Sequence, residues 1–128
     1  MSLNYRISKR KNTIHTKQPE NYMMQSIHTG EVNLERIAYE ISNESTLSDT
    51  DIIAVLHALG TKVQFHLAEG KVVNLENLGR FKVGFQAPAQ SKPEQLSPTQ
   101  IKKFYINYQP SLKLKKWLKA GLNVRKEK

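Results

Sequence analysis

The first half of the chain has hydrophobic positions every three or four residues, which is the period of an amphipathic helix. A first helix is predicted to begin after Asn33, with an apolar stripe of Leu34, Ile37, Ala38 and Ile41. A second helix is predicted to begin after the N-cap Ser48 and to end at about Glu69, before Gly70. Its apolar face consists of Ile52, Val55, Leu56, Leu59, Val63 and Leu67. At about 1.5 Å per residue this helix is roughly 30 Å long, and a second copy of it is the simplest cover for so long an apolar face.

After Gly70 apolar and polar positions alternate, which is the period of a strand. Two strands are predicted around a turn in which Asn77 and Gly79 take positive φ. Residues 86–97 are polar and contain two prolines, so they are predicted to form an arm or loop. A third strand is predicted at about residues 103–108, followed by a short helix that ends at Gly121 and by a frayed, basic tail at residues 123–128.

The alternation also predicts which side chains share a face of this sheet. One face is expected to be apolar and to carry Phe81, Val83, Phe85, Phe104, Ile106 and Tyr108. The other is expected to carry Lys82, Lys103, Tyr105 and Asn107. Two further strand-like segments, residues 4–8 and 22–26, precede the helices and are expected to pair with each other or to cap a sheet edge.

Positive charge is concentrated toward the C-terminal end of the sequence. The 128 residues have a formal net charge of +9, with 8 Lys/Arg against 9 Asp/Glu in residues 1–79 and 12 against 2 in residues 80–128. Clustered Lys and Arg favour a polyanionic partner, because they neutralise phosphates and release condensed counterions. The alternative is a surface that serves only solubility.

The composition also argues against several kinds of chemistry. The chain has no cysteine, which excludes disulfides, a thiolate nucleophile and a cysteine-based zinc site, and which is typical of a cytoplasmic protein. No secretory signal and no membrane partner are expected, because no apolar run reaches about 18 residues. The four histidines lack metal-binding spacing, and no catalytic pair or phosphate-binding glycine loop is visible. We therefore expect no enzymatic activity, cofactor, metal or small-molecule substrate.

Four short motifs resemble the bacterial histone-like HU/IHF family of DNA-bending proteins. They are Leu47-Ser48 with Asp51-Ile52, Leu67-Ala68-Glu69-Gly70, Val73-Asn74-Leu75 leading to Leu78-Gly79-Arg80-Phe81, and Tyr108-Gln109-Pro110. The third is the most specific, because the family has a G-[FL]-G-x-F turn there, in which Asn77 replaces the first glycine. The resemblance covers about residues 34–122. The extension at residues 1–31 makes the extended HU-like subfamily, HU-HIG, the better match.

The resemblance implies an α+β fold with two N-terminal helices, a three-stranded antiparallel sheet with a shortened arm, a short C-terminal helix and an N-terminal strand extension. It implies an extension at residues 1–31, an HU-like DNA-binding domain at 32–122 and a basic tail at 123–128. It also implies an intertwined homodimer whose sheets form a saddle for duplex DNA. The residues expected in the core or the dimer interface are Ile52, Leu56, Leu59, Val63, Leu67, Phe81, Val83, Phe104 and Tyr108.

The expected DNA contacts are the polar residues of the sheet and two lysines of the last helix: Arg80, Lys82, Lys102, Lys103, Tyr105, Asn107, Lys113 and Lys116. Lys and Arg would contact phosphates, Asn107 would bind sugar or minor-groove acceptors, and Tyr105 would lie against the DNA backbone. The family's Arg-Asn-Pro-x-Thr arm tip is absent, and Ser97-Pro98-Thr99 is the nearest equivalent. Pro98 is therefore either a wedge between base pairs or a turn-forming proline.

The function that this implies is that of a homodimeric nucleoid-associated protein in the bacterial cytoplasm. It would bind double-stranded DNA with little sequence specificity and contribute to chromosome condensation. One alternative is an HU-like dimeric structural module whose N-terminal extension binds a protein partner. Another is a protein that binds RNA or single strands, although few aromatics are available for base stacking.

Overall fold

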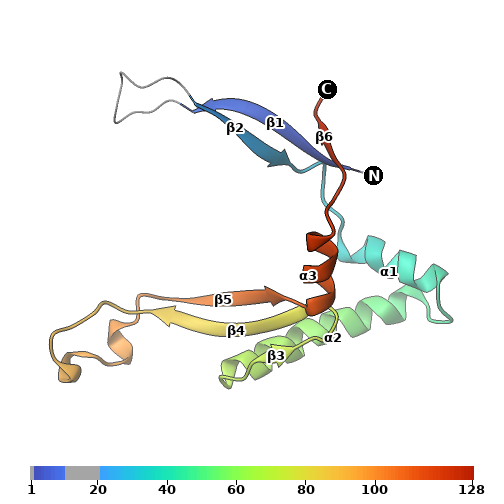
Figure 1. Cartoon of the computed structure of the whole chain (residues 1–128). Helices are drawn as coiled ribbons and strands as arrows, with labels where there is room; N and C mark the ends of the chain where they lie inside the picture. Colours follow the sequence, from blue (N-terminus) through green and yellow to red (C-terminus); the bar gives the residue numbers. More distant parts are fainter. Residues whose placement is uncertain (1, 11–20) are drawn as a thin grey trace. The chain divides into compact units, whose positions relative to one another are not determined.

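The computed structural model describes residues 2–10 and 21–128. The chain divides into two compact units (Figure 1). Unit 1 combines Met1–Asn33 with Ala120–Lys128, and unit 2 is Leu34–Lys119. Within the described residues, no helix is both long and apolar enough to cross a membrane.

Unit 2 begins with the two predicted helices, α1 (Leu34–Asn43) and α2 (Asp49–Ala68), which pack against each other. The prediction of an N-cap at Ser48 is confirmed, because its side chain accepts a hydrogen bond from the Asp51 N–H at 3.2 Å. Two carboxylates in the first turn of α2 complement the positive end of the helix dipole. The helix is capped at Glu69, and Gly70 follows with φ of 81°, a conformation that favours glycine and ends the helix as predicted.

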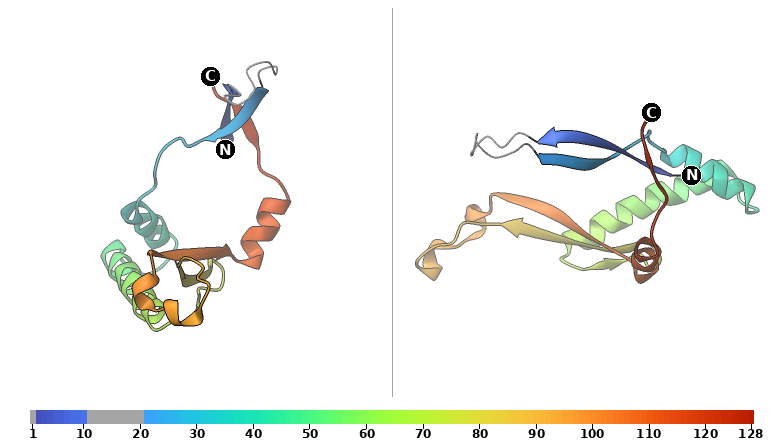
Figure 2. Two further views of the ribbon diagram at one scale, coloured as in Figure 1. Left: turned by 90° about the vertical axis from the view of Figure 1, so that its left-hand side faces the viewer. Right: turned by 45° about the horizontal axis from the view of Figure 1, so that its top comes forward.

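The sheet of unit 2 has the order β3-β4-β5, and both strand pairs are antiparallel as predicted. Its strands are β3 (Val73–Asn74), β4 (Gly79–Gln86) and β5 (Lys103–Pro110), and α3 (Leu112–Lys119) follows β5. The arm between β4 and β5 contains two short 3₁₀ turns, Pro93–Gln95 and Pro98–Gln100. Figures 1 and 2 show that the arm extends beyond the end of α2.

The turn between β3 and β4 differs from the prediction in one residue. Positive φ occurs at Glu76 (51°) and Gly79 (134°), so the prediction for Gly79 is correct and the one for Asn77 is wrong. The cause is a side-chain hydrogen bond: the Glu76 N–H donates to Asn74 Oδ1 at 3.0 Å and fixes a tight turn one residue earlier. Asn77 instead anchors the turn, because its carbonyl accepts from Ser111 Oγ at 2.6 Å.

Few hydrophobic side chains are buried within a single copy of the chain. Of the described residues, only Ala38, Ile52 and Leu67 are buried hydrophobics. Among the other residues expected in the core or the dimer interface, Leu56, Val63 and Phe81 are half-buried, whereas Leu59, Val83, Tyr108 and Phe104 are exposed by 37% to 68%. Between α2 and the sheet lies an open groove of about 440 Å³, lined mainly by apolar residues that include Val63, Val83 and Ile106. Unit 2 therefore leaves much of its apolar surface uncovered.

Unit 1 is a three-stranded sheet with the order β2-β1-β6. The two predicted extension strands are confirmed, because β1 (Leu3–Arg10) pairs antiparallel with β2 (Asn21–Ile27). The prediction of a frayed tail is wrong, because β6 (Val124–Lys126) pairs parallel with the first half of β1. The end of the tail is fixed by Glu127, whose carboxylate accepts two hydrogen bonds from the Arg6 guanidinium. The C-terminal residues are thus part of the sheet built by the N-terminal extension.

Candidate nucleic-acid interface

The pairing of β4 with β5 separates apolar from polar side chains as predicted. Directly opposite residues on antiparallel strands share a face. The apolar face is formed by the pairs Phe81 with Tyr108, Val83 with Ile106, and Phe85 with Phe104. Val83 and Ile106 of this face line the open groove beside α2, so this side of the sheet is turned toward α2.

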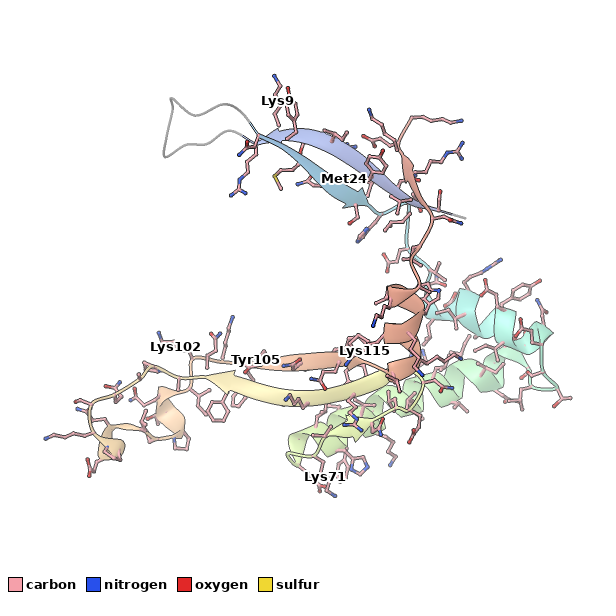
Figure 3. The ribbon with its side chains drawn as sticks, viewed as in Figure 1. Lys9, Met24, Lys71, Lys102, Tyr105 and Lys115 are labelled. Atoms are coloured by element: carbon pink, nitrogen blue, oxygen red, sulfur yellow. The ribbon has the colours of Figure 1, made fainter. Side chains whose placement is uncertain are left out.

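The opposite side, here called the polar sheet face, carries Arg80, Lys82, Gln86, Lys103, Tyr105, Asn107 and Gln109. Its cross-strand pairs are Arg80 with Gln109, Lys82 with Asn107, and Gln86 with Lys103. Figure 3 shows Lys102, Tyr105 and Lys115 along the side of the sheet away from α2, whereas Lys71 lies near the end of α2. The face carries three cations and no carboxylate, so its surface potential is positive.

Two shallow hollows lie along this face. One, of about 160 Å³, is lined by Val72, Arg80, Lys82, Asn107 and Gln109. The other, of about 300 Å³, lies toward α3, and Arg80, Gln109 and Lys115 are among the residues that line it. The structure thus brings Arg80, Lys82 and Asn107 together at the inner end of the face. Lys103 and Tyr105 lie farther toward the arm on the same face.

Tyr105 has a position that the sequence pattern did not reveal. It lies opposite Gly84, and a Cβ built on Gly84 would lie 2.6 Å from the Cζ and Oη atoms of Tyr105. The ring therefore lies over the glycine, in space that any other residue would fill. A cross-strand aromatic ring over glycine is a known way to support a sheet. Here the ring of Tyr105, a residue that is 43% exposed, gives the polar sheet face a flat aromatic surface.

Three other predicted positions have different surroundings. Lys102 lies just before β5, where its N–H donates to the Gln86 carbonyl at 2.8 Å. Lys113 and Lys116 are exposed on α3 and do not line either hollow, whereas Lys115 does. The sequence prediction also missed Gln109, although continuing the alternation of β5 by one step would have found it. Adding Lys115 and Gln109 leaves the predicted basic surface in the same place.

Pro98 is the first residue of a 3₁₀ turn in the arm. Proline suits this position, because its fixed φ is helical and the first N–H of a helical turn needs no partner. The turn-forming interpretation therefore accounts for this residue, and its action as a wedge stays a prediction. In the described part of the chain, no group of three or more His, Cys, Asp or Glu side chains is placed to hold a metal ion.

Comparison with known families identifies the chain. A family model described as "HU-HIG: HU domain fused to wHTH, Ig, or Glycine-rich motif" matches residues 1–126. The chain belongs to the HU-HIG family. The match includes the extension and β6, so both units of the HU-HIG chain are part of the family pattern.

The fold of this HU-HIG protein is similar to that of a solved structure, "a Putative bacterial DNA binding protein from Bacteroides vulgatus ATCC 8482". The TM-score is 0.67 at 15% sequence identity, and the alignment covers 98% of this chain. It covers 47% of the other chain, so this chain spans about half the length of the protein that it matches. No curated protein matches the sequence.

Proposed function

We propose that this HU-HIG protein binds duplex DNA with little sequence specificity, using the polar sheet face. The observation that carries the proposal is the register of β4 and β5, which gathers the cations and amides on one side of the sheet. Family membership supports it, as does the DNA-binding description of the Bacteroides vulgatus protein with a similar fold.

Each group on the face has a role that fits contact with the DNA backbone. Arg80, Lys82 and Lys103 bind phosphates, which provide affinity without sequence information. Asn107 bonds sugar or minor-groove acceptors, and the exposed ring of Tyr105 lies against the sugar-phosphate backbone. The face carries one Arg and few base-reading amides, so shape and charge dominate recognition. Lys102, Lys113, Lys115 and Lys116 extend the same positive surface.

We further propose that the binding form is a homodimer. The open groove beside α2 and the small number of buried hydrophobics support a second copy as the missing cover. Val55 on α2 is 63% exposed and Ile106 on β5 is 64% exposed, although both are apolar. Exposed apolar area of this kind marks an interaction surface. Light scattering at micromolar concentration should give twice the mass of the chain, and a monomer at all concentrations would contradict this part.

The biological setting follows as part of the same proposal. The protein acts without catalysis or a cofactor, on the nucleoid in the bacterial cytoplasm, and contributes to chromosome condensation. Support comes from the family and from the net charge of +9, which favours binding to a polyanion such as genomic DNA at any site along it.

The decisive experiment compares two double variants that change the net charge equally. Lys82→Glu with Lys103→Glu reverses charge on the polar sheet face, whereas Lys62→Glu with Lys71→Glu does so at α2 and just beyond its end. Binding to a linear duplex is measured by fluorescence anisotropy over a salt series. The wild type should show log affinity falling with log salt by about 0.9 per phosphate contact. The first variant should lose most binding, and the second should retain most of it.

Equal losses in the two variants would refute a binding surface on this face. Absence of duplex binding by the wild type at low salt would refute the function itself. Competition with single-stranded DNA and RNA of the same length tests whether duplex DNA is the preferred ligand. Stronger binding to either competitor would make that competitor the ligand instead. Each variant is checked by circular dichroism, so that unfolding is not mistaken for lost contact.

A further inference from the structure

The sheet of unit 1 also has two chemically different faces. The pairs Tyr5 with Ser26, Ile7 with Met24, and Lys9 with Tyr22 lie on one side, and this side is mostly apolar and aromatic. The other side holds the pairs Arg6 with Gln25 and Arg10 with Asn21, and it continues to Arg125 beside Asn4. We call this second side the arginine face. Met23 and Ile27 also lie on it, between and beyond the polar pairs.

The arginine face concentrates one residue type. Of the five arginines in the chain, Arg6, Arg10 and Arg125 share this face. Arginine presents a planar fork of donors that matches phosphate oxygens and guanine edges, which lysine does not. The neighbouring Asn and Gln side chains are the amides that pair with adenine. A surface that served only solubility would need neither arginine in place of lysine nor amides beside it.

Charge counted by folded unit gives a different distribution from charge counted along the sequence. Unit 1 contains 8 Lys/Arg and 3 Asp/Glu, whereas unit 2 contains 12 and 8 although it is twice as long. Because β6 joins β1, the cations of the C-terminal tail are added to those of the extension. Unit 1 is therefore the more basic unit for its size, and a polyanion is the partner that its charge favours.

The shape of this sheet suits a particular site on duplex DNA. Beyond Tyr5, where the pairing with β6 ends, β1 and β2 form a two-stranded antiparallel ribbon. A ribbon of this width can enter the major groove. Asn4, which lies beside Arg125, and Arg10 are six residues apart on β1, or about 20 Å at the rise of a strand. That spacing exceeds the groove width of about 12 Å, so the two ends can reach phosphates on both sides of it.

The three arginines are not equivalent. Arg6 donates two hydrogen bonds to the Glu127 carboxylate, one of them 3.1 Å long, and this ion pair compensates its charge and fixes its side chain. Arg10 and Arg125 are exposed at opposite ends of the face. Contact with phosphates therefore falls to Arg10 and Arg125, while Gln25, opposite Arg6, lies between them where a base edge would be.

We propose that the arginine face is a second duplex-DNA contact surface, which enters the major groove with Gln25 at its centre and Arg10 and Arg125 on the flanking phosphates. This proposal goes beyond the one for the polar sheet face, and unit 1 could bind DNA even if that face did not. It gives the extension a direct role in binding. A protein with an acidic surface is the other occupant that such a face would accept.

The test uses two double variants of the full chain with equal charge change. Arg10→Gln with Arg125→Gln removes the proposed phosphate contacts and leaves the Arg6–Glu127 pair. Lys9→Gln with Lys126→Gln removes the same charge from immediate sequence neighbours on the opposite side, where the Lys9 ammonium lies 5.9 Å from the Tyr22 ring centre. Both are measured beside the wild type and the Lys82→Glu, Lys103→Glu variant in a salt series with one linear duplex. Circular dichroism confirms that each is folded.

The arginine variant should lower the salt slope by about 1.8, which corresponds to two lost phosphate contacts. The lysine variant should change it by less than half as much. Equal slopes in the two variants, or a wild-type slope in the arginine variant, would overturn the proposal and leave the face to an acidic protein. If only the Lys82→Glu, Lys103→Glu variant loses binding, the function proposed for the polar sheet face stands alone. If only the arginine variant loses binding, the proposal for the arginine face stands alone. A wild type that binds no duplex would overturn both proposals.

Discussion

Gly79 connects the β3–β4 turn to the sheet, and replacing it with alanine should be severely destabilising. Its φ of 134° lies in a region that residues with a side chain rarely adopt, and this strain costs about 1–3 kcal/mol. A Cβ at this position would lie 2.3 Å from the Gln109 carbonyl oxygen and 2.9 Å from the Tyr108 ring. Strand β5 would have to move, which disturbs the 2.7 Å hydrogen bond from the Tyr108 hydroxyl to the Leu78 carbonyl and costs about another 1 kcal/mol. We expect Gly79→Ala to lower the free energy of unfolding by about 3 kcal/mol in total.

Gly84→Ala is the matched control for this prediction. Its Cβ would meet only the far end of the Tyr105 side chain, which can rotate away, and its φ is not positive. The free energy of unfolding should therefore change by less than about 1 kcal/mol. Urea unfolding followed by circular dichroism measures both variants at one protein concentration, because the stability of the proposed dimer would depend on concentration. A Gly79→Ala variant as stable as Gly84→Ala would refute the close contact of the turn with β5.

Three further changes test other parts of the structure. Tyr105→Ala should weaken duplex binding about fivefold, or about 1 kcal/mol. Gly84→Ala should reproduce part of that loss without unfolding, because the added methyl group displaces the Tyr105 ring. Unchanged anisotropy titrations in both variants would exclude the ring from the interface. Ser48→Ala should cost about 1 kcal/mol in urea unfolding, because it removes the acceptor of the Asp51 N–H, whereas Ser48→Thr should restore most of it. The side-chain hydrogen bond from Arg6 holds the pKa of Glu127 below its ordinary value of 4.5. The contribution of this ion pair to stability is therefore present above pH 4.5 and is lost as the pH falls through the lowered pKa. The protection factor of the Glu127 N–H, which donates to the Tyr5 carbonyl at 3.0 Å, should fall on such acidification once the slower intrinsic exchange at low pH is taken into account. Glu127→Gln should abolish that pH step, and a step of the same size in this variant would rule out the ion pair as its cause.

The features that the sequence predicted well depend on short-range periodicity. Helix α2 was predictable because its apolar positions repeat and because Ser48 and Gly70 mark its ends. The two faces of β4 and β5 were predictable because a strand places alternate side chains on opposite sides whatever its partner. The family resemblance also depended on residues close together in sequence.

The features that it missed depend on particular tertiary partners. Asn74 and Ser111 decide the path of the β3–β4 turn, and Ser111 lies 34 residues from the carbonyl that it binds. The position of Tyr105 over Gly84 requires the register across the arm, which no local pattern contains. Strand β6 has three residues, too few to show a period, and its partner β1 is at the other end of the chain.

This last contact changes how the charge of the chain should be interpreted. Along the sequence, the cations after residue 80 form one basic segment, which suggests one binding surface. In the fold, Arg125 belongs to the same sheet as Arg6 and Arg10, while Arg80 and Lys82 belong to the sheet of the other unit. Deleting residues 123–128 would therefore remove a strand and the partner of Arg6 as well as charge. A loss of DNA binding in such a truncation could not be assigned to electrostatics, whereas the paired glutamine substitutions keep the strand and change only side chains of the arginine face.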